Sequence, residues 1–155
     1  MASKRVRLFA REEILNAEGA EDAQRTQKDS PLENDFSHEI IGAALEVQRA
    51  LGTGLLESAY TAALAIELAE REIGFAQEVP VTGFYKGKPL GLAYRADFIV
   101  EGSVIVEVKA IDAVTELHRA QLLSYLRVSG LHLGLLINFH AFPLVKGVHR
   151  MVNKL

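Results

Sequence analysis

The sequence contains no cysteine. This absence excludes disulfide bonds, thiolate zinc sites and thiol nucleophiles, so the fold must be held together by its hydrophobic core. No apolar run approaches the roughly 18 residues that a membrane-spanning helix requires. A glycine loop with a phosphate-binding lysine, an internal repeat and a low-complexity stretch are also missing. We therefore expect a cytoplasmic protein without a membrane segment.

Strong basic charge is missing as well, because the net charge is −3. The average hides an asymmetry. Residues 1–108 carry 11 Lys and Arg against 18 Asp and Glu, whereas residues 109–155 carry 6 against 2 and hold four of the five histidines. Ordinary solvated charges would give the same counts, but a surface that binds nucleic acid would have to come from the C-terminal part. The candidate phosphate contacts there are Arg119, Lys146 and Arg150.

The length of 155 residues and a hydrophobic content of 49% favour one domain. Residues 1–33 are rich in charge, alanine, glutamine and serine, which is typical of a tail or a marginal helix. Residues 34–155 are expected to form the domain.

The first half of that domain has helical periodicity. It predicts a helix over residues 37–51, with Asn34 or Ser37 as its cap and Gly52 as its end. A second helix is predicted over residues 56–73, ending at Gly74.

The pattern then changes to the alternation that is typical of strands. Thr115 is expected to cap a further helix that ends at Gly130. The resulting order, ααβββαβ(β), indicates an α/β fold with a mixed sheet flanked by helices. The predicted strands cover residues 75–85, 89–100, 103–111, 131–139 and, as an edge strand, 145–152, with turns at 86–88 and 101–102.

Acidic and basic side chains interrupt two of these strands. Alternation places Ile105, Glu107 and Lys109 on one face of their strand. The preceding strand holds one acid, Asp97, within an apolar run. Because paired residues share a face, Asp97 and Glu107 converge only if opposed residue numbers have an even sum. We therefore predict an odd loop, most simply residues 101–103 with Gly102 at positive φ, or a bulge that restores the parity.

Two interpretations fit this cluster. Lys109 could neutralise the two acids in a structural ion pair, because an unpaired carboxylate on a packed sheet is costly. Alternatively, two carboxylates and one ammonium group are what a Mg²⁺ site needs, with hard oxygen ligands for the metal and a charge beside the reacting water.

The spacing from Asp97 to Glu107-Val108-Lys109 resembles the D…(D/E)XK signature of the PD-(D/E)XK nuclease superfamily. Residues 54–60, GLLESAY, resemble the GxxExxY motif of the GxxExxY proteins within it. Gln121 and Tyr125 form the expected QxxxY pattern on the following helix, and LGLLINF supplies the next strand. The resemblance spans residues 36–142, and its one departure is Ala96 where the superfamily's name has proline.

The resemblance implies a Mg²⁺- or Mn²⁺-dependent nuclease that acts on nucleic acid, with DNA as the expected substrate. Asp97, Glu107 and the Val108 carbonyl would be metal ligands, and Lys109 would be the catalytic lysine. Glu57 would be a supporting acid at the metal, although a glutamate there also suits the positive end of a helix dipole.

Gln121 and Tyr125 would orient catalytic groups or a phosphate, together with His118 one turn earlier, unless they are only a polar flank of the helix. His132, His140 and His149 lack metal-ligand spacing and are expected at the surface. A small domain offers little surface to a duplex, so a homodimer is compatible with the sequence.

Two other functions remain open. One is a nucleic-acid-binding or assembly module that keeps the nuclease fold without turnover. The other is an interaction protein in which the acids and the lysine form an ion-pair cluster. Metal binding through Asp97 and Glu107 distinguishes the nuclease from this cluster.

Overall fold

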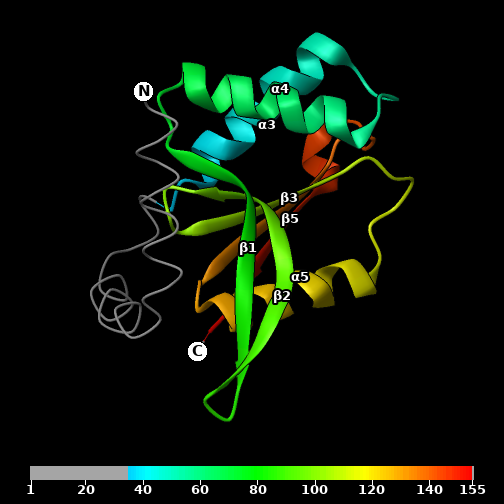
Figure 1. The fold of residues 1–155 in the computed structure, drawn as a ribbon. Helices are drawn as coiled ribbons and strands as arrows, with labels where there is room; N and C mark the ends of the chain where they lie inside the picture. The colour runs from blue at the N-terminus through cyan, green and yellow to red at the C-terminus, as the bar shows by residue number, and fades with distance from the viewer. Residues whose placement is uncertain (1–34, 155) are drawn as a thin grey trace.

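The computed structural model describes residues 35–154; the tail predicted for residues 1–33 and the cap predicted at Asn34 lie outside this range. Within it, a five-stranded sheet separates two helices on one face from a single helix on the other (Figure 1). No helix of residues 35–154 has both the length and the apolar character needed to cross a bilayer.

The order of elements agrees with the predicted ααβββαβ(β), with a short 3-10 helix before the last strand. The elements are α3 (Ser37–Leu51), α4 (Glu57–Glu70), β1 (Phe75–Tyr85), β2 (Lys88–Val100), β3 (Val104–Lys109), α5 (Glu116–Ser129), β4 (Leu133–Asn138), η1 (Leu144–Gly147) and β5 (Val148–Val152).

The strands lie in the sheet in their sequence order, β1-β2-β3-β4-β5. All neighbouring pairs are antiparallel except β3 and β4, which are parallel. That parallel pair requires a crossover, and α5 provides it. The mixed α/β fold that the sequence predicts is thus confirmed.

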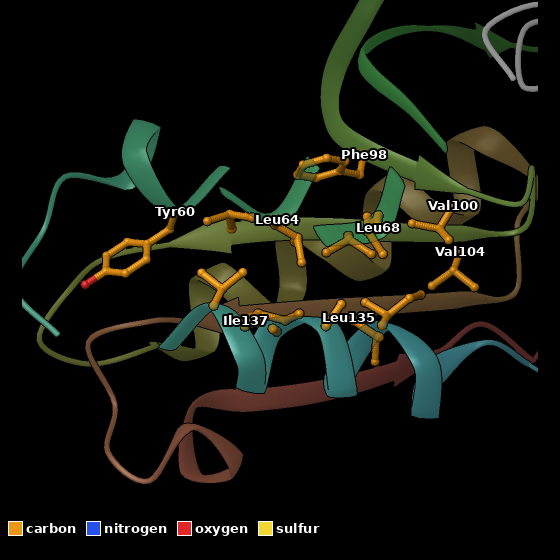
Figure 2. Close-up of a cluster of buried hydrophobic side chains, with 14 of the residues drawn as sticks. Tyr60, Leu64, Leu68, Phe98, Val100, Val104, Leu135 and Ile137 are labelled. Carbon is orange, nitrogen blue, oxygen red and sulfur yellow. The ribbon is translucent and has the colours of Figure 1, made fainter. Parts of the chain in front are cut away.

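Each face of the sheet has its own hydrophobic core. The larger core packs α3 and α4 against even-numbered residues of β2 and β3 (Figure 2). The smaller core packs Leu122 and Leu126 of α5 against the opposite face. The approach of α5 is so close that a Cβ on Gly134 of β4 would lie 2.9 Å from Leu122 Cδ1, which explains a glycine inside a buried strand.

The helix ends differ in detail from the sequence predictions. Asp35, rather than Ser37, supplies the side-chain acceptor at the start of α3, where its Oδ1 accepts from Ser37 N at 2.9 Å. Gly52 ends α3 with φ 72°, as predicted. However, α4 stops at Glu70, before the predicted Gly74, because Glu72 itself takes the left-handed conformation with φ 58°.

The alternation of β1 and β2 shifts by one residue near Asp97. Phe98 faces the α3–α4 core, whereas Ala96 belongs to the α5 core. The same shift occurs across the ladder around Glu78, whose φ is 49°. A left-handed residue inside a strand twists the ladder and exchanges its faces, so the outer half of the β1–β2 hairpin turns its buried side towards α5.

Candidate active site

The site lies where β2 parts from β3. These strands pair only over Phe98–Val100 and Val104–Val106, after which β2 continues with β1 alone and β3 with β4 alone. The pairing Phe98↔Val106 has the predicted even sum, so the next position places Asp97 opposite Glu107. The turn between the strands covers residues 101–103, with Gly102 at φ 65°. The predicted odd loop is confirmed.

At the fork where β2 and β3 part, the side chain of Asp97 replaces a backbone hydrogen-bond partner. Its Oδ2 accepts a hydrogen bond from Val108 N at 2.9 Å. The backbone amide of β3 is thus satisfied by a side chain of β2 rather than by the ladder, and the carboxylate is held beside Glu107.

Glu107 is a buried carboxyl group, with 8% of its surface exposed. Its Oε1 has no hydrogen-bond partner within residues 35–154. Burial, followed by the negative charge of Asp97 and a side-chain hydrogen bond to it, raises the pKa of Glu107 to about 9, although Lys109 opposes the shift. At neutral pH and without a cation the Glu107 carboxyl group therefore keeps its proton.

Lys109 ends β3 on the same face as Glu107 and is half-buried. Within the described residues it makes no ion pair with a carboxylate. The structural ion pair that the sequence left open is therefore not formed among residues 35–154. Lys109 still acts at a distance, since its charge lowers the pKa of both Glu107 and Glu57.

Glu57 is the first residue of α4, a segment that precedes β2 and β3 in the sequence. Burial and the charge of Asp97 raise the pKa of Glu57, whereas the charge of Lys109 opposes this rise. The preceding loop is fastened by Tyr60, whose hydroxyl donates to Gly52 O at 2.8 Å and accepts from Leu55 N at 3.1 Å. Gly54 takes φ 95° in this loop, so the residues of the GxxExxY pattern have a structural reason for their spacing.

Tyr125 is the member of the QxxxY pattern that reaches the site. The charges of Glu107 and Asp97 add to burial in raising its pKa. Its ring stacks on Tyr94, with the ring centroids 3.9 Å apart. Gln121 is exposed, and its side chain makes no hydrogen bond within residues 35–154.

His118 does not point into the site. Its Nδ1 accepts from Thr115 N at 2.9 Å, and Thr115 Oγ1 accepts from His118 N at 3.4 Å. The two residues form a capping box at the start of α5. The predicted cap at Thr115 is confirmed, and the Nδ1 atom of His118 is used in this cap.

Two of the three predicted phosphate contacts, Arg119 and Arg150, have ion-pair partners in different segments of the chain. Arg119 of α5 pairs with Glu116 and lies 3.4 Å from His149 Nδ1. Arg150 is the next residue along β5 and therefore points to the opposite face, where it pairs with Asp35 at 2.7 Å. Lys146 lies on η1, which directly precedes β5.

The three histidines expected at the surface are instead half-buried. His132 Nδ1 lies 2.8 Å from Asn153 O, and His140 Nε2 lies 2.9 Å from Leu55 O. Together with the contact between His149 and Arg119, these contacts hold chain ends and loops in place.

Sequence reasoning missed Asn138. It is the last residue of β4, the strand that pairs in parallel with β3. Its side chain accepts from Ile111 N at 3.1 Å and donates to Ile111 O at 2.8 Å. Phe139 N also donates to Lys109 O at 2.9 Å. The sequence signal for Asn138 was a polar residue at the end of the apolar run LGLLIN. In the parallel ladder Asn138 pairs with Lys109.

The fold and this constellation were compared with known proteins. Among protein-family models, that of the PD-(D/E)XK nuclease superfamily matches residues 34–151. The chain belongs to this superfamily. Neither the search of curated proteins nor that of solved structures gave a match. Membership in the PD-(D/E)XK nuclease superfamily suggests nuclease activity, and its nucleases typically use divalent metals.

The residues at the fork suit such a metal. Mg²⁺ and Mn²⁺ prefer carboxylate and carbonyl oxygens, and Glu107 Oε1 is a buried oxygen without a hydrogen-bond partner. The fit rests on two carboxylates, because no group of three or more His, Asp or Glu within residues 35–154 is arranged to hold a metal ion.

Proposed function

We propose that this chain is a Mg²⁺- or Mn²⁺-dependent nuclease that hydrolyses phosphodiester bonds, with DNA as its substrate. The observation that carries the proposal is the unpartnered Oε1 of buried Glu107 beside Asp97. An isolated buried carboxylate is costly unless a partner compensates it, and within residues 35–154 no lysine or arginine pairs with it.

Asp97 and Glu107 would hold the metal with the Val108 carbonyl, and Glu57 would support it from α4. The bound metal would polarise the phosphate and lower the pKa of a water molecule. Glu107 must release its proton for this role, since its pKa is about 9 in the metal-free chain.

Lys109 supplies the positive charge on the same face. Its ammonium group would stabilise the negative charge that develops on the phosphate or position the water. Tyr125 would orient the phosphate or Lys109. Burial and then the charges of Glu107 and Asp97 raise the pKa of Tyr125. Exposed Gln121 would have a similar but weaker role.

A nucleic-acid-binding module without turnover is the second candidate. It is favoured by the absence, among residues 35–154, of a third acidic or histidine ligand in the cluster. This candidate predicts nucleic-acid binding that is independent of both metal and Glu107.

A cleavage assay tests the proposal. Wild type, Glu107→Gln and Lys109→Ala would be incubated with single-stranded, double-stranded and branched DNA and RNA, in Mg²⁺, Mn²⁺ or chelator. We expect metal-dependent cleavage by the wild type alone, and Mn²⁺ binding by calorimetry that Glu107→Gln abolishes. The matched controls are the exposed Glu70→Gln and Lys154→Gln, which should cleave like wild type.

The outcome separates the two candidates. If the wild type binds nucleic acid but cuts none of these substrates with either metal, the binding module replaces the nuclease. If both activity and Mn²⁺ binding persist in Glu107→Gln, the site has been assigned to the wrong residues.

A further inference from the structure

The outer part of the β1–β2 hairpin extends beyond the rest of the described molecule (Figure 1). Past the pair Val81↔Tyr94, nearly all of its residues are exposed. Four large apolar side chains there are about 60% exposed or more: Phe84 64%, Tyr85 63%, Leu90 64% and Leu92 59%. A cluster of exposed apolar side chains on a projecting arm marks an interaction surface.

The same arm is basic in an acidic chain. Residues 79–96 contain Lys86, Lys88 and Arg95 and no acidic residue, whereas the whole chain has a net charge of −3. Lys86 Nζ lies 5.4 Å from the centroid of the Tyr85 ring, so positive charge and aromatic surface are presented together. The turn at Lys86-Gly87 has two positive φ values, 51° and 74°, which is the geometry of a tight two-residue hairpin.

We propose that this hairpin tip, defined as residues 84–90, is a nucleic-acid contact. Lys86 and Lys88 contact phosphates, and the rings of Phe84 and Tyr85 pack against bases or sugars, as aromatic side chains do on nucleic acids. This inference rests on the proposed nuclease function and adds a nucleic-acid contact surface to it.

A second copy of the chain suits the hairpin less well. β1 is an edge strand, but Pro80 removes one of its N–H groups and Lys86 places a charge near the turn. Proline and lysine on an edge strand oppose pairing with another strand. Two such tips would also bring like charges together, whereas phosphates complement them.

The strand β2 connects the tip to the site. Lys88 and Asp97 are nine residues apart on it, about 30 Å at the rise of an extended strand. That length corresponds to about nine base pairs of duplex at ~3.4 Å per pair. The tip would therefore hold DNA close to one helical turn away from the phosphate that is cut.

The test compares two double variants with matched controls. Phe84→Ala with Tyr85→Ala removes the rings, and Lys86→Gln with Lys88→Gln removes the charges. Ile66→Ala, 61% exposed on α4, and exposed Lys154→Gln are the controls. Dissociation constants for a 30-base-pair duplex would be measured in chelator at several salt concentrations, and melting curves would verify folding.

We expect the lysine variant to bind more weakly and to reduce the slope of log affinity against log salt by about 1–2, roughly 0.9 for each lost phosphate contact. The aromatic variant should lose roughly tenfold or more in affinity with an unchanged salt slope. Both variants should cleave a stem of about 8 base pairs, too short to reach the tip, at the wild-type rate.

If wild type cuts DNA while both hairpin variants bind the long duplex as tightly as it does, the hairpin proposal is overturned and the nuclease stands. If wild type neither binds nor cuts nucleic acid, both fail. Sedimentation of all proteins provides the remaining outcome: a wild-type dimer that the aromatic variant dissociates, with nucleic-acid affinity unchanged, would assign the tip to a second copy.

Discussion

The two faces of β3 have opposite physical characters. Val104, Val106 and Val108 face the α3–α4 core, where every neighbour in the cluster is apolar or is Tyr60 with its hydroxyl satisfied (Figure 2). On the other face, Glu107 is also buried but leaves an oxygen without a partner in the described structure. One strand thus carries stabilising burial on one side and a destabilising carboxyl pair on the other. Under the proposed function, the polar face serves chemistry rather than stability.

The largest expected effect comes from substituting neighbours on opposite faces of β2. Phe98→Ala should lower the free energy of unfolding by about 3–5 kcal/mol, because the ring is fully buried. Asp97→Asn should leave the melting temperature unchanged or raise it, since the amide oxygen can still accept from Val108 N while the negative charge that raises the pKa of Glu107 disappears. Denaturant unfolding and Mn²⁺ calorimetry measure both effects, and Asp97→Asn should abolish metal binding.

This comparison would break if metal-free Asp97→Asn lost several kcal/mol and Mn²⁺ left the wild-type melting temperature unchanged. Such a result is expected of a buried ion pair that has lost one partner, and it would favour the interaction-protein interpretation.

Lys109→Ala should separate activity from stability most clearly. Removing a positioned charge beside a reacting phosphate costs about 10²–10³-fold in rate, whereas the absence of an ion pair within residues 35–154 predicts little change in melting temperature. Lys109→Arg should not restore activity, because a planar guanidinium group does not replace a compact ammonium group. Single-turnover cleavage rates beside thermal melts provide the measurement. Equal cleavage by wild type and Lys109→Ala would remove Lys109 from the mechanism.

The pH dependence of stability should reflect Glu107. Its carboxyl group has a pKa of about 9 in the folded chain, above its ordinary 4.5. The folded state therefore retains a proton that the unfolded state releases. Its contribution to stability is complete below pH ~4.5 and is lost as pH rises through about 9. Metal-free melts from pH 5 to 9 should show this loss, and Glu107→Gln should flatten it.

Mn²⁺ affinity should change in the opposite direction. Because binding displaces the Glu107 proton, the affinity should increase by up to tenfold per pH unit between pH ~6 and 8. Affinity that is independent of pH in this range would mean that the metal does not bind through Glu107.

The smallest effects are expected on α5. Tyr125→Phe keeps the ring on Tyr94 and removes only the hydroxyl, and Gln121→Ala removes an exposed amide, so each should reduce the cleavage rate less than Lys109→Ala does. His118→Ala should leave the rate unchanged and lower stability by about 1 kcal/mol through the lost cap contact. A rate loss in Gln121→Ala that matches Lys109→Ala would show that an exposed residue reacts rather than orients.

Much of this arrangement could be predicted from local rules. Side-chain parity in a hairpin depends only on sequence numbers, so the hypothesis that Asp97 and Glu107 share a face was enough to predict an odd turn, most simply residues 101–103. The order of elements followed from the change from helical to strand periodicity. The end of α4 did not, because Glu72 adopts a left-handed conformation that propensity assigns to glycine.

The parts that could not be predicted depend on contacts between distant segments. Arg150 is basic in sequence, but only the fold shows that Asp35, 115 residues away along the chain, pairs with it. The change of faces at Glu78, which turns the outer hairpin towards α5, results from one backbone angle. Periodicity cannot detect it, because alternation continues on both sides of the shift.

Asn138 has a consequence for how freely Lys109 moves. The strand β3 ends at Lys109, and strand ends usually fray. Here the Asn138 side chain binds both backbone groups of Ile111, and Phe139 N binds Lys109 O, so the chain stays fixed two residues beyond the last ladder pair. Only the side-chain torsions of Lys109 remain to be ordered when a substrate binds. The entropy of positioning its backbone has already been lost during folding.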